Sequence, residues 1–340
     1  MTSDDHRAPL VSVVIPTTGR AELSRAIESA RNQAGQLRVE IIVVNDNLDE
    51  DAVGDVDADK VIWTGGARRG GHARNLGVLA SSGDFVAFLD DDDEWIPTKL
   101  RDQLLLMGSA PNPSLVVVSG RHVHVQATTG RTSRPGPDRL IRAGQPVDEY
   151  LFRRRRPSGG RASMYTSTLL CSKELATRVP WREELVRHQD WDWLVRLSEV
   201  PGVTFTHCPQ VVTRIQTGSP GSISASVDWS SSLEWADNVL KNDAVAADFL
   251  VAQTLRYAIS AHSLVGVRLV ARRIAARRRV PSLGPMVIGL LGFVPRRRLE
   301  GLMTRGVRSV SGRQSGSRST DGRGLAKAIR GMNARRSRER

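Results

Sequence analysis

Apolar residues in the first 90 positions alternate between continuous runs and positions with helical spacing. Residues 10–16 (LVSVVIP) and 39–45 (VEIIVVN) are rich in β-branched side chains, which indicates strands buried on both faces of a parallel sheet. Between them, the apolar residues of segment 23–30 recur with the period of an amphipathic helix. A strand, a helix and a second strand within about 35 residues predict a βαβ unit.

The same alternation continues through the next hundred residues. Further strands are expected at 60–64, 84–90, 114–120, 204–206 and 211–215, and further helices at 72–81, 97–108 and 183–200. Regular alternation of the two element types predicts an α/β fold in which helices flank a mainly parallel sheet.

The last third of the chain has a different pattern. Residues from Trp229 to about Leu302 have helical spacing interrupted by prolines, and beyond Arg305 the chain is rich in Gly, Ser and Arg. This composition predicts disorder. We therefore expect an α/β domain at 9–225, a helical region at 226–304 and a disordered basic tail at 305–340. The apolar stretch 285–294 has about half the length needed to cross a bilayer.

Charge is distributed unevenly over the 340 residues, whose net charge is +13. Residues 256–340 hold 21 of the 49 Lys and Arg but three of the 36 acidic residues, so they carry +18 and residues 1–255 carry −5. Arginine clusters beside apolar helical positions favour contact with an anionic membrane. Nucleic acid is disfavoured, because no aromatic residues alternate with these arginines. The alternative is a helical region packed on the α/β domain with a solvated basic face.

Two features bear on the compartment. Cys171 and Cys208 both lie in apolar runs, without a second thiol or a histidine at metal-ligand spacing, so we expect reduced core residues. Met1–Leu10 is polar and has no apolar core of a secretory signal. These features predict a cytoplasmic protein, with peripheral contact at the inner face of the cell membrane through the basic region.

The strongest local signal is the run Asp90-Asp91-Asp92-Asp93, which follows the apolar segment 84–89. Neighbouring carboxylates repel one another, so a cation should compensate their charge. Asp90 and Asp92 can turn to one side and share Mg²⁺ or Mn²⁺, which prefers oxygen ligands and retains substrate phosphates. The alternative is a solvated turn before the next helix.

Four motifs in this order resemble the family 2 glycosyltransferases, which have the GT-A fold, a Rossmann-like α/β fold. The resemblance covers residues 10–224 and rests on segments 11–20 (VSVVIPTTGR), 41–47 (IIVVNDN), 71–77 (GHARNLG) and 85–95, the last of which resembles the DxD segment. It implies a nucleotide-sugar donor and a divalent metal, Mg²⁺ or Mn²⁺, held by Asp92 and Asp90. It places these residues at the donor: Pro16, Thr17, Arg20, Asp46, Arg74, Asp90 and Asp91.

The chain departs from the family at the end of the second strand, where Asn45 replaces the first of two usual acids. An amide changes the donor and acceptor pattern offered to a base, so the resemblance leaves the nucleotide open. The family's Arg-x-His is Arg214-Ile215-Gln216 here, which argues against a metal ligand at Gln216. His207 is interpreted as a core histidine. Ser222 and Ser224 weakly match a loop that covers donor phosphates.

The resemblance also implies the catalytic base. Segment 187–197 (RHQDWDWLVRL) is similar to the family's helix whose aspartate deprotonates the acceptor, and this role falls on Asp190 rather than Asp192. Gln189 stands where the family has a second acid. Trp191 and Trp193 are candidates for stacking on an acceptor sugar, and core packing is the alternative for both.

The implied reaction is transfer of a sugar, with inversion, from a nucleotide-diphosphate donor to a hydroxyl of a saccharide or lipid-linked acceptor. The resemblance places such a reaction in cell-envelope or polysaccharide biosynthesis. Two alternatives remain at this point. A sugar nucleotidyltransferase usually has a Gly- and Arg-rich phosphate loop after its first strand, and Pro16-Thr17-Thr18-Gly19 does not resemble one. The second alternative is a noncatalytic protein that binds nucleotide sugars, and it holds only if Asp190 does not act as a base.

Overall fold

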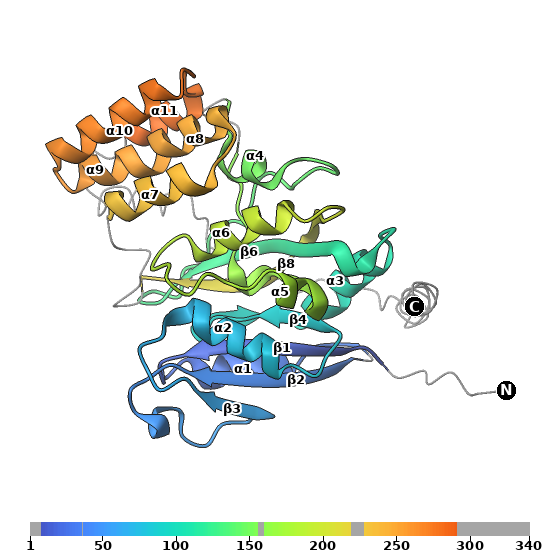
Figure 1. The fold of residues 1–340 in the computed structure, drawn as a ribbon. Coiled ribbons are helices and arrows are strands. Elements are labelled where there is room, and N and C mark those ends of the chain that lie inside the picture. The colour runs from blue at the N-terminus through green and yellow to red at the C-terminus, as the bar shows by residue number, and fades with distance from the viewer. Residues whose placement is uncertain (1–7, 36, 156–159, 219–227, 291–340) are drawn as a thin grey trace.

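A mixed β-sheet forms the centre of the protein in the computed structural model, which describes residues 8–35, 37–155, 160–218 and 228–290 (Figure 1). Its strands are β1 (Leu10–Thr17), β2 (Arg38–Asn45), β3 (Lys60–Trp63), β4 (Phe85–Phe88), β5 (Glu94–Trp95), β6 (Val116–Gln126), β7 (Leu170–Ser172) and β8 (Thr204–Thr217). They form one sheet in the order β3-β2-β1-β4-β7-β6-β8-β5. β1, β2, β3 and β4 are parallel, as are β6 and β8, whereas β7 and β5 pair antiparallel with their neighbours.

Helices cover both faces of this sheet. Val13 and Ile15 of β1 face one core, whereas Val14 faces the other, as expected for a strand whose side chains alternate. The first core contains α1 (Leu23–Arg31) and α3 (Lys99–Gly108), and the second contains α2 (Arg69–Ala80), α5 (Lys173–Arg178) and α6 (Gln189–Ser198). Shorter elements are α4 (Val147–Phe152), η1 (Glu50–Val53), η2 (Pro113–Leu115) and η3 (Thr166–Thr168). This arrangement confirms the predicted α/β fold.

The close packing of α2 on β1 depends on Gly77. A Cβ atom at Gly77 would lie 2.3 Å from Cγ1 of Val14, far inside van der Waals contact. The hydrogen atom of glycine therefore lets α2 approach the sheet closely. This contact fixes the first turns of α2, which carry Arg74, above the end of β1.

Several predicted boundaries differ from the structure, and three of these differences lie near the acidic run or Asp190. β4 ends at Phe88, so the acidic run forms a turn rather than the end of a strand. β8 is a single strand of 14 residues instead of two short ones, because pairing with β6 continues past residues 207–210 through a bulge at Gly120–His122. α6 begins only at Gln189, since His188 before it has the left-handed backbone conformation (φ 58°).

The C-terminal helices pack on the α/β part through a third apolar core. They are α7 (Trp229–Val239), α8 (Asp243–Phe249), the π-helix η5 (Leu250–Leu255), α9 (Arg256–Ser260), α10 (Leu264–Ala276) and α11 (Leu283–Leu290). Phe152 and Val195 from the α/β part join Trp235 and Phe249 in this core. No helix within the described ranges is long and apolar enough to cross a bilayer. The predicted tail at 305–340 lies outside the described residues.

The two cysteines confirm their interpretation as core residues. Cys171 and Cys208 are both buried and free. Burial raises the pKa of the Cys171 thiol to about 12, which makes it unreactive at neutral pH.

Candidate active site

The candidate site lies where β1 and β4 end beside each other. β1 ends with the half-buried Pro16 and the buried Thr17, and Arg20 follows in the turn before α1. The acidic run 90–93 follows β4, which pairs in parallel with β1. The chain proceeds from β1 through β2 and β3 on one side and returns to β4 on the other. Such a reversal of strand order is where open α/β sheets bind ligands.

The four aspartates of the turn have separate partners. Thr17 Oγ1 donates to Asp91 Oδ2 at 2.6 Å, and Asp91 is buried. Asp93 accepts from Ser167 Oγ at 2.6 Å and from the Gln216 backbone N–H at 2.9 Å. Asp91 and Asp93 therefore anchor the turn to neighbouring elements. Burial, the largest cause, raises the pKa of both carboxyls.

The two remaining aspartates each bind an arginine. Arg20 Nη1 lies 2.9 Å from Asp92 Oδ2, and Arg74 Nη2 lies 2.7 Å from Asp90 Oδ1. Arg74 is buried, and its guanidinium group lies 4.9 Å from the centre of the Trp181 ring. The structure thus gathers the predicted donor residues Thr17, Arg20, Arg74, Asp90 and Asp91 around one turn.

The donor set fits a divalent ion that shares its ligands with a substrate. Asp90 and Asp92 belong to the same turn, and burial, followed by the charge of Asp90, raises the pKa of Asp92 to about 6. No group of three or more His, Cys, Asp or Glu side chains that could hold a metal occurs in the described part of the chain. Mg²⁺ or Mn²⁺ would therefore need phosphate or water oxygens to complete its shell.

The turn after β2 explains why an amide stands at position 45. Asn45 is fully buried; its Nδ2 donates to the carbonyls of Asp49 and Glu50, and its Oδ1 accepts from the Asn47 N–H. A carboxylate has no hydrogen to donate to these carbonyls. Asn45 therefore shapes the turn, with its amide group bonded to backbone groups of residues 47–50.

Asp46 also organises its surroundings. Its Oδ1 accepts from Thr64 Oγ1 at 2.6 Å and from the Arg68 N–H at 2.8 Å, and its Oδ2 accepts from the Arg69 N–H at 2.7 Å. Asp46 thereby holds the segment that leads into α2. Its contact with a base or ribose stays a prediction.

Asp190 lies at the start of α6, beside the Arg74–Asp90 pair. The neighbouring Gln189 accepts from Arg74 Nη1 at 3.0 Å, so α6 and α2 meet at this arginine. Asp190 Oδ1 accepts from the Trp191 N–H at 2.9 Å. Burial raises the pKa of Asp190 to about 6, with Asp90 raising it further and Arg74 lowering it. A carboxylate with such a pKa suits proton abstraction near neutral pH.

Asp192 is unsuited to be the base. It is fully buried and pairs with Arg182 Nη1 at 3.2 Å and Arg196 Nε at 2.7 Å. Trp235 Nε1 also donates to it at 3.2 Å. Asp192 therefore joins α6 to α7, a larger structural role than that of an ordinary acid in a first helical turn.

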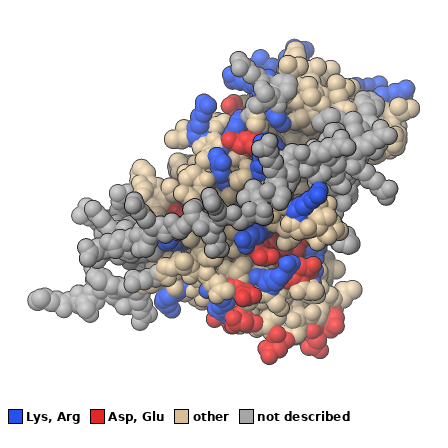
Figure 2. All heavy atoms as spheres, turned by 180° about the vertical axis from the view of Figure 1, so that it is seen from behind, with Lys and Arg blue, Asp and Glu red and all other residues tan. Residues whose placement is uncertain are grey.

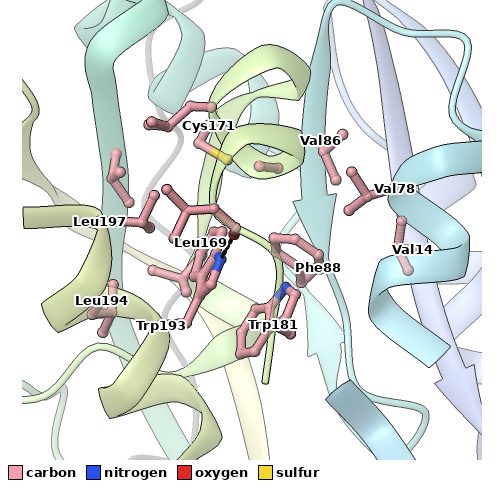
Figure 3. Packing of buried hydrophobic residues seen from close by; sticks show 14 of the residues in the cluster. Val14, Val78, Val86, Phe88, Leu169, Cys171, Trp181, Trp193, Leu194 and Leu197 are labelled. Atoms are coloured by element: carbon pink, nitrogen blue, oxygen red, sulfur yellow. Dashed lines mark hydrogen bonds between the residues drawn. The ribbon is translucent and has the colours of Figure 1, made fainter. Parts of the chain in front are cut away.

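The two candidate acceptor tryptophans have different surroundings. Trp193 is fully buried, stacks on Trp181 at 4.5 Å and meets Phe88 edge-on at 5.3 Å (Figure 3). No acceptor can reach it there, so its proposed role at the acceptor is wrong. Trp191 is half-buried and stacks on His188 at 4.8 Å. It lines a cavity beside the C-terminal helices, and its acceptor contact stays a prediction.

Gln216 and His207 are structural in the described region. Only the backbone N–H of Gln216 contacts the acidic turn. His207 is buried, and its Nδ1 accepts from the Ile141 N–H at 3.3 Å. Burial lowers the pKa of His207 to about 4, consistent with a neutral core histidine. Ser222 and Ser224 lie outside the described residues.

Sequence reasoning overlooked the roles of several residues near the site. Ser167 donates to Asp93 and accepts from the backbone N–H of Asp90. Tyr165 contacts the rings of His122 and His124 at 4.6 and 5.5 Å. The spacing of the two histidines, two residues apart in a strand, places them on one face and could have indicated this cluster.

Comparisons with known proteins agree with this geometry. Residues 12–173 match the model described as glycosyl transferase family 2. The amylovoran biosynthesis glycosyltransferase AmsB of Erwinia amylovora is 26% identical over 237 residues, which cover 64% of this chain and 75% of that protein. A GalNAc(5)-diNAcBac-PP-undecaprenol beta-1,3-glucosyltransferase of Campylobacter jejuni is 38% identical over 95 residues, 25% of this chain and 30% of that protein.

A solved structure supports the fold. The crystal structure of S. aureus TarS 1-349 in complex with UDP-GlcNAc superposes with a TM-score of 0.54 at 15% identity, covering 96% of this chain and 91% of that one. At this identity the likeness establishes the fold alone. Because the family match begins in β1 and ends after β7, it contains the acidic turn and Arg74. Over residues 12–173 the chain is therefore similar to the family 2 glycosyltransferases.

Proposed function

We propose that the protein transfers a sugar, with inversion, from a nucleotide-diphosphate donor to an acceptor hydroxyl, with Asp190 as general base. The observation that carries this proposal is the position of Asp190 beside the Arg74–Asp90 pair, with a pKa of about 6. At neutral pH this carboxylate is ionised and can accept a proton. The relatives named above support an acceptor that is a saccharide or a lipid-linked saccharide of the cell envelope.

The reaction is one displacement. Asp190 takes the proton from the acceptor hydroxyl. At the same time the acceptor oxygen bonds to the anomeric carbon, and the bond from that carbon to the diphosphate oxygen breaks. A single displacement inverts the anomeric configuration, and a nucleoside diphosphate leaves. Arg20 and Arg74, which bind Asp92 and Asp90 in this structure, can turn to the phosphate oxygens as strong, bidentate donors.

Asp90 and Asp92 would hold the divalent ion, Mg²⁺ or Mn²⁺. When bound, such an ion neutralises negative charge on a leaving diphosphate. Thr17 fixes Asp91 behind these two carboxylates through a hydrogen bond of 2.6 Å. The remaining assignments, Pro16 and Asp46 at the base and ribose and Trp191 at the acceptor, belong to the same proposal.

The test uses the full chain with a panel of nucleotide sugars, beginning with UDP-GlcNAc, and Mn²⁺. Release of nucleoside diphosphate should depend on Mn²⁺ and fall about a hundredfold or more in Asp190→Asn, the usual contribution of a general base. The matched control is Glu174→Gln, at an exposed acid of α5, which should behave like the parent.

Three outcomes would overturn the proposal. Release of pyrophosphate from a nucleoside triphosphate and a sugar phosphate would identify a nucleotidyltransferase. Donor binding without any turnover would identify a noncatalytic binding protein. Full activity in Asp190→Asn would remove the assigned base, and retention of the donor's anomeric configuration, measured by NMR of the product, would remove the single displacement.

The C-terminal helices support a second part of the proposal, peripheral binding to an anionic membrane at the inner face of the cell membrane. On α10, Leu264, Val265 and Leu269 are 74, 64 and 40% exposed, and Arg268 and Arg272 are exposed on the same helix. On α11 the exposed apolar side chains are Leu283, Met286, Val287 and Leu290. Figure 2 shows basic side chains over these helices and acidic side chains gathered at the opposite end of the face in view.

Apolar side chains between cations suit the boundary of acyl chains and anionic headgroups. Full-length protein should float with vesicles that contain phosphatidylglycerol, and Leu269→Glu with Val287→Glu should reduce flotation. Leu79→Glu, at a side chain of α2 that is 66% exposed, is the matched control. Equal flotation of both variants, or none of the parent, would refute membrane binding by this face.

A further inference from the structure

A cavity of about 260 Å³ lies between the α/β part and the C-terminal helices. Its walls come from β6, residues 136–154 and 160–165, the start of α6, and the C-terminal helical elements α8, η5, α9 and α11. This volume is slightly below the range of about 300–1,000 Å³ that is typical of pockets for drug-sized ligands, so the cavity suits a small ligand such as one sugar unit.

The cavity adjoins the proposed base. Trp191 lines it and follows Asp190 directly in α6. Tyr165 also lines it, and the charge of Asp190 adds to burial in raising the Tyr165 pKa to about 12. The cavity therefore begins one residue from the proposed base along α6.

Aromatic side chains give the cavity a surface for a sugar. Phe152 and Phe249 meet the ring of Trp191 edge-on at 5.3 and 5.8 Å. Burial lowers the pKa of His122 to about 3 and that of His124 to about 4. Both imidazoles are therefore neutral at neutral pH, and they can exchange hydrogen bonds with hydroxyl groups.

The ionised side chains among the described lining residues of the cavity are all positively charged. Four arginines line the cavity (Arg139, Arg154, Arg161 and Arg256), and none of its described lining residues is acidic. The guanidinium group of Arg161 forms one long ion pair, in which its Nε lies 3.6 Å from the carboxylate of Asp138. Burial, with the charges of Arg154 and Arg142, lowers the pKa of Arg139, as expected where cations lie near one another.

Two of these guanidinium groups keep unused donors. Arg139 Nη2 donates to the carbonyls of Tyr150 and Arg153, and Arg256 Nη2 donates to Gln253 Oε1 at 3.2 Å. The buried Nε atoms of Arg139 and Arg256 have no hydrogen-bond partner among the described residues. Buried donors without partners are costly, so an anionic ligand that accepts their hydrogens would be strongly favoured.

A second hollow extends this basic surface. It has a volume of about 560 Å³ and shares Arg139 and Arg154 with the cavity, while Arg142, Arg153 and Arg155 line the rest. Glu149 is the acidic residue among its described lining. A chain that leaves the cavity in this direction thus meets further cations.

We propose, on the basis of the transfer reaction above, that this cavity binds the acceptor and that the acceptor carries an anionic group beside its reacting sugar. The group is a phosphate or a carboxylate, bound by Arg139 and Arg256 while the sugar contacts Trp191. A phosphate would indicate a phosphorylated or diphosphate-linked acceptor, and a carboxylate would indicate an acidic polysaccharide.

The experiment is calorimetry on the full chain with UDP and Mn²⁺ at saturating concentration, so that the donor site is filled. The probes are glucose 1-phosphate, glucuronic acid and methyl glucoside. We expect one of the two anions to bind at least tenfold more tightly than methyl glucoside. Arg256→Gln should weaken that binding at least tenfold, the value of one charge-assisted hydrogen bond. Arg161→Gln is a second variant, at an arginine that already pairs with Asp138. It should weaken binding of the anion less than Arg256→Gln does.

The matched control is Arg178→Gln, at an exposed arginine of α5 outside the cavity, with binding equal to the parent. Preference for glucose 1-phosphate or for glucuronic acid identifies the source of the charge. Equal binding of methyl glucoside and both anions, or an Arg256→Gln protein that is folded by circular dichroism and binds like the parent, overturns the inference. A separate titration with UDP-GlcNAc and Mn²⁺ measures donor binding alone. It distinguishes a failure of the proposed transfer function from a failure of the cavity to bind an anion.

Discussion

Replacement of Asp190 by asparagine should stabilise the fold while it removes transfer. Asparagine has almost the same shape and keeps an oxygen for the Trp191 N–H, which is bonded at 2.9 Å. Burial, with the charge of Asp90, raises the pKa of Asp190 from 3.8 to about 6. One pKa unit corresponds to about 1.4 kcal/mol, so the ionised carboxylate costs the folded protein up to about 3 kcal/mol, less where solvent reaches it.

The stability difference between the parent and Asp190→Asn should depend on pH. Because the pKa is higher in the folded state, the cost is absent well below pH 4, grows as pH rises, and is complete above about pH 6. Urea unfolding of parent and Asp190→Asn should therefore differ by up to about 3 kcal/mol at pH 7.5 and by about half as much at pH 5.

Asp192→Asn, two residues away, is the matched control. It removes the charge that pairs with Arg182 and Arg196 and should destabilise the protein by about 3 kcal/mol. An Asp190→Asn protein that is less stable than the parent at pH 7.5, or a difference that ignores pH, would refute the reasoning.

Four further predictions follow from the site and the core. Since burial raises the pKa of Asp190 to about 6, kcat/KM for transfer should fall about tenfold per pH unit below about pH 6; a flat profile to pH 5 would contradict the ionised role of Asp190. EDTA should abolish diphosphate release and Mn²⁺ should restore it, with Asp92→Asn requiring more Mn²⁺ for half-maximal rate; activity in EDTA would refute the metal. Trp193→Ala should lower the free energy of unfolding by about 4 kcal/mol in urea, because its fully buried ring fills the core; a loss under about 1 kcal/mol would deny that placement. Gly77→Ala should cost about 1–3 kcal/mol, because the new Cβ meets Val14 at 2.3 Å; a Tm equal to that of the parent would mean that α2 moves freely.

Much of the α/β framework could be predicted because its signals are local. Runs such as 10–16 and 39–45 are apolar over consecutive residues, and β1 and β2 extend them by at most one residue. The acidic run 90–93 is predicted to continue a strand, whereas the structure ends β4 at Phe88 and forms a turn from the run, still at the carboxyl side of that strand.

The remaining features depend on partners far apart in the chain. Asp91 and Asp93 anchor the acidic turn because they bond to Thr17 and Ser167, each of which is more than 70 residues away in the chain. Trp193 appears equivalent to Trp191 in sequence, and only the burial against Trp181 separates them. The arginine-lined cavity combines residues from 122 to 288, which no local pattern brings together.

The third apolar core makes the C-terminal helices part of the same cooperative folding unit as the α/β part. Phe152 and Val195 share it with Trp235 and Phe249, and Trp235 also bonds the buried Asp192. A chain shortened before residue 226 would expose this aromatic surface to water and leave Asp192 short of a donor. The helices therefore cannot be exchanged between relatives as an independent module, and any chimaera must carry over the matching faces of α4 and α6 to unfold in a single transition.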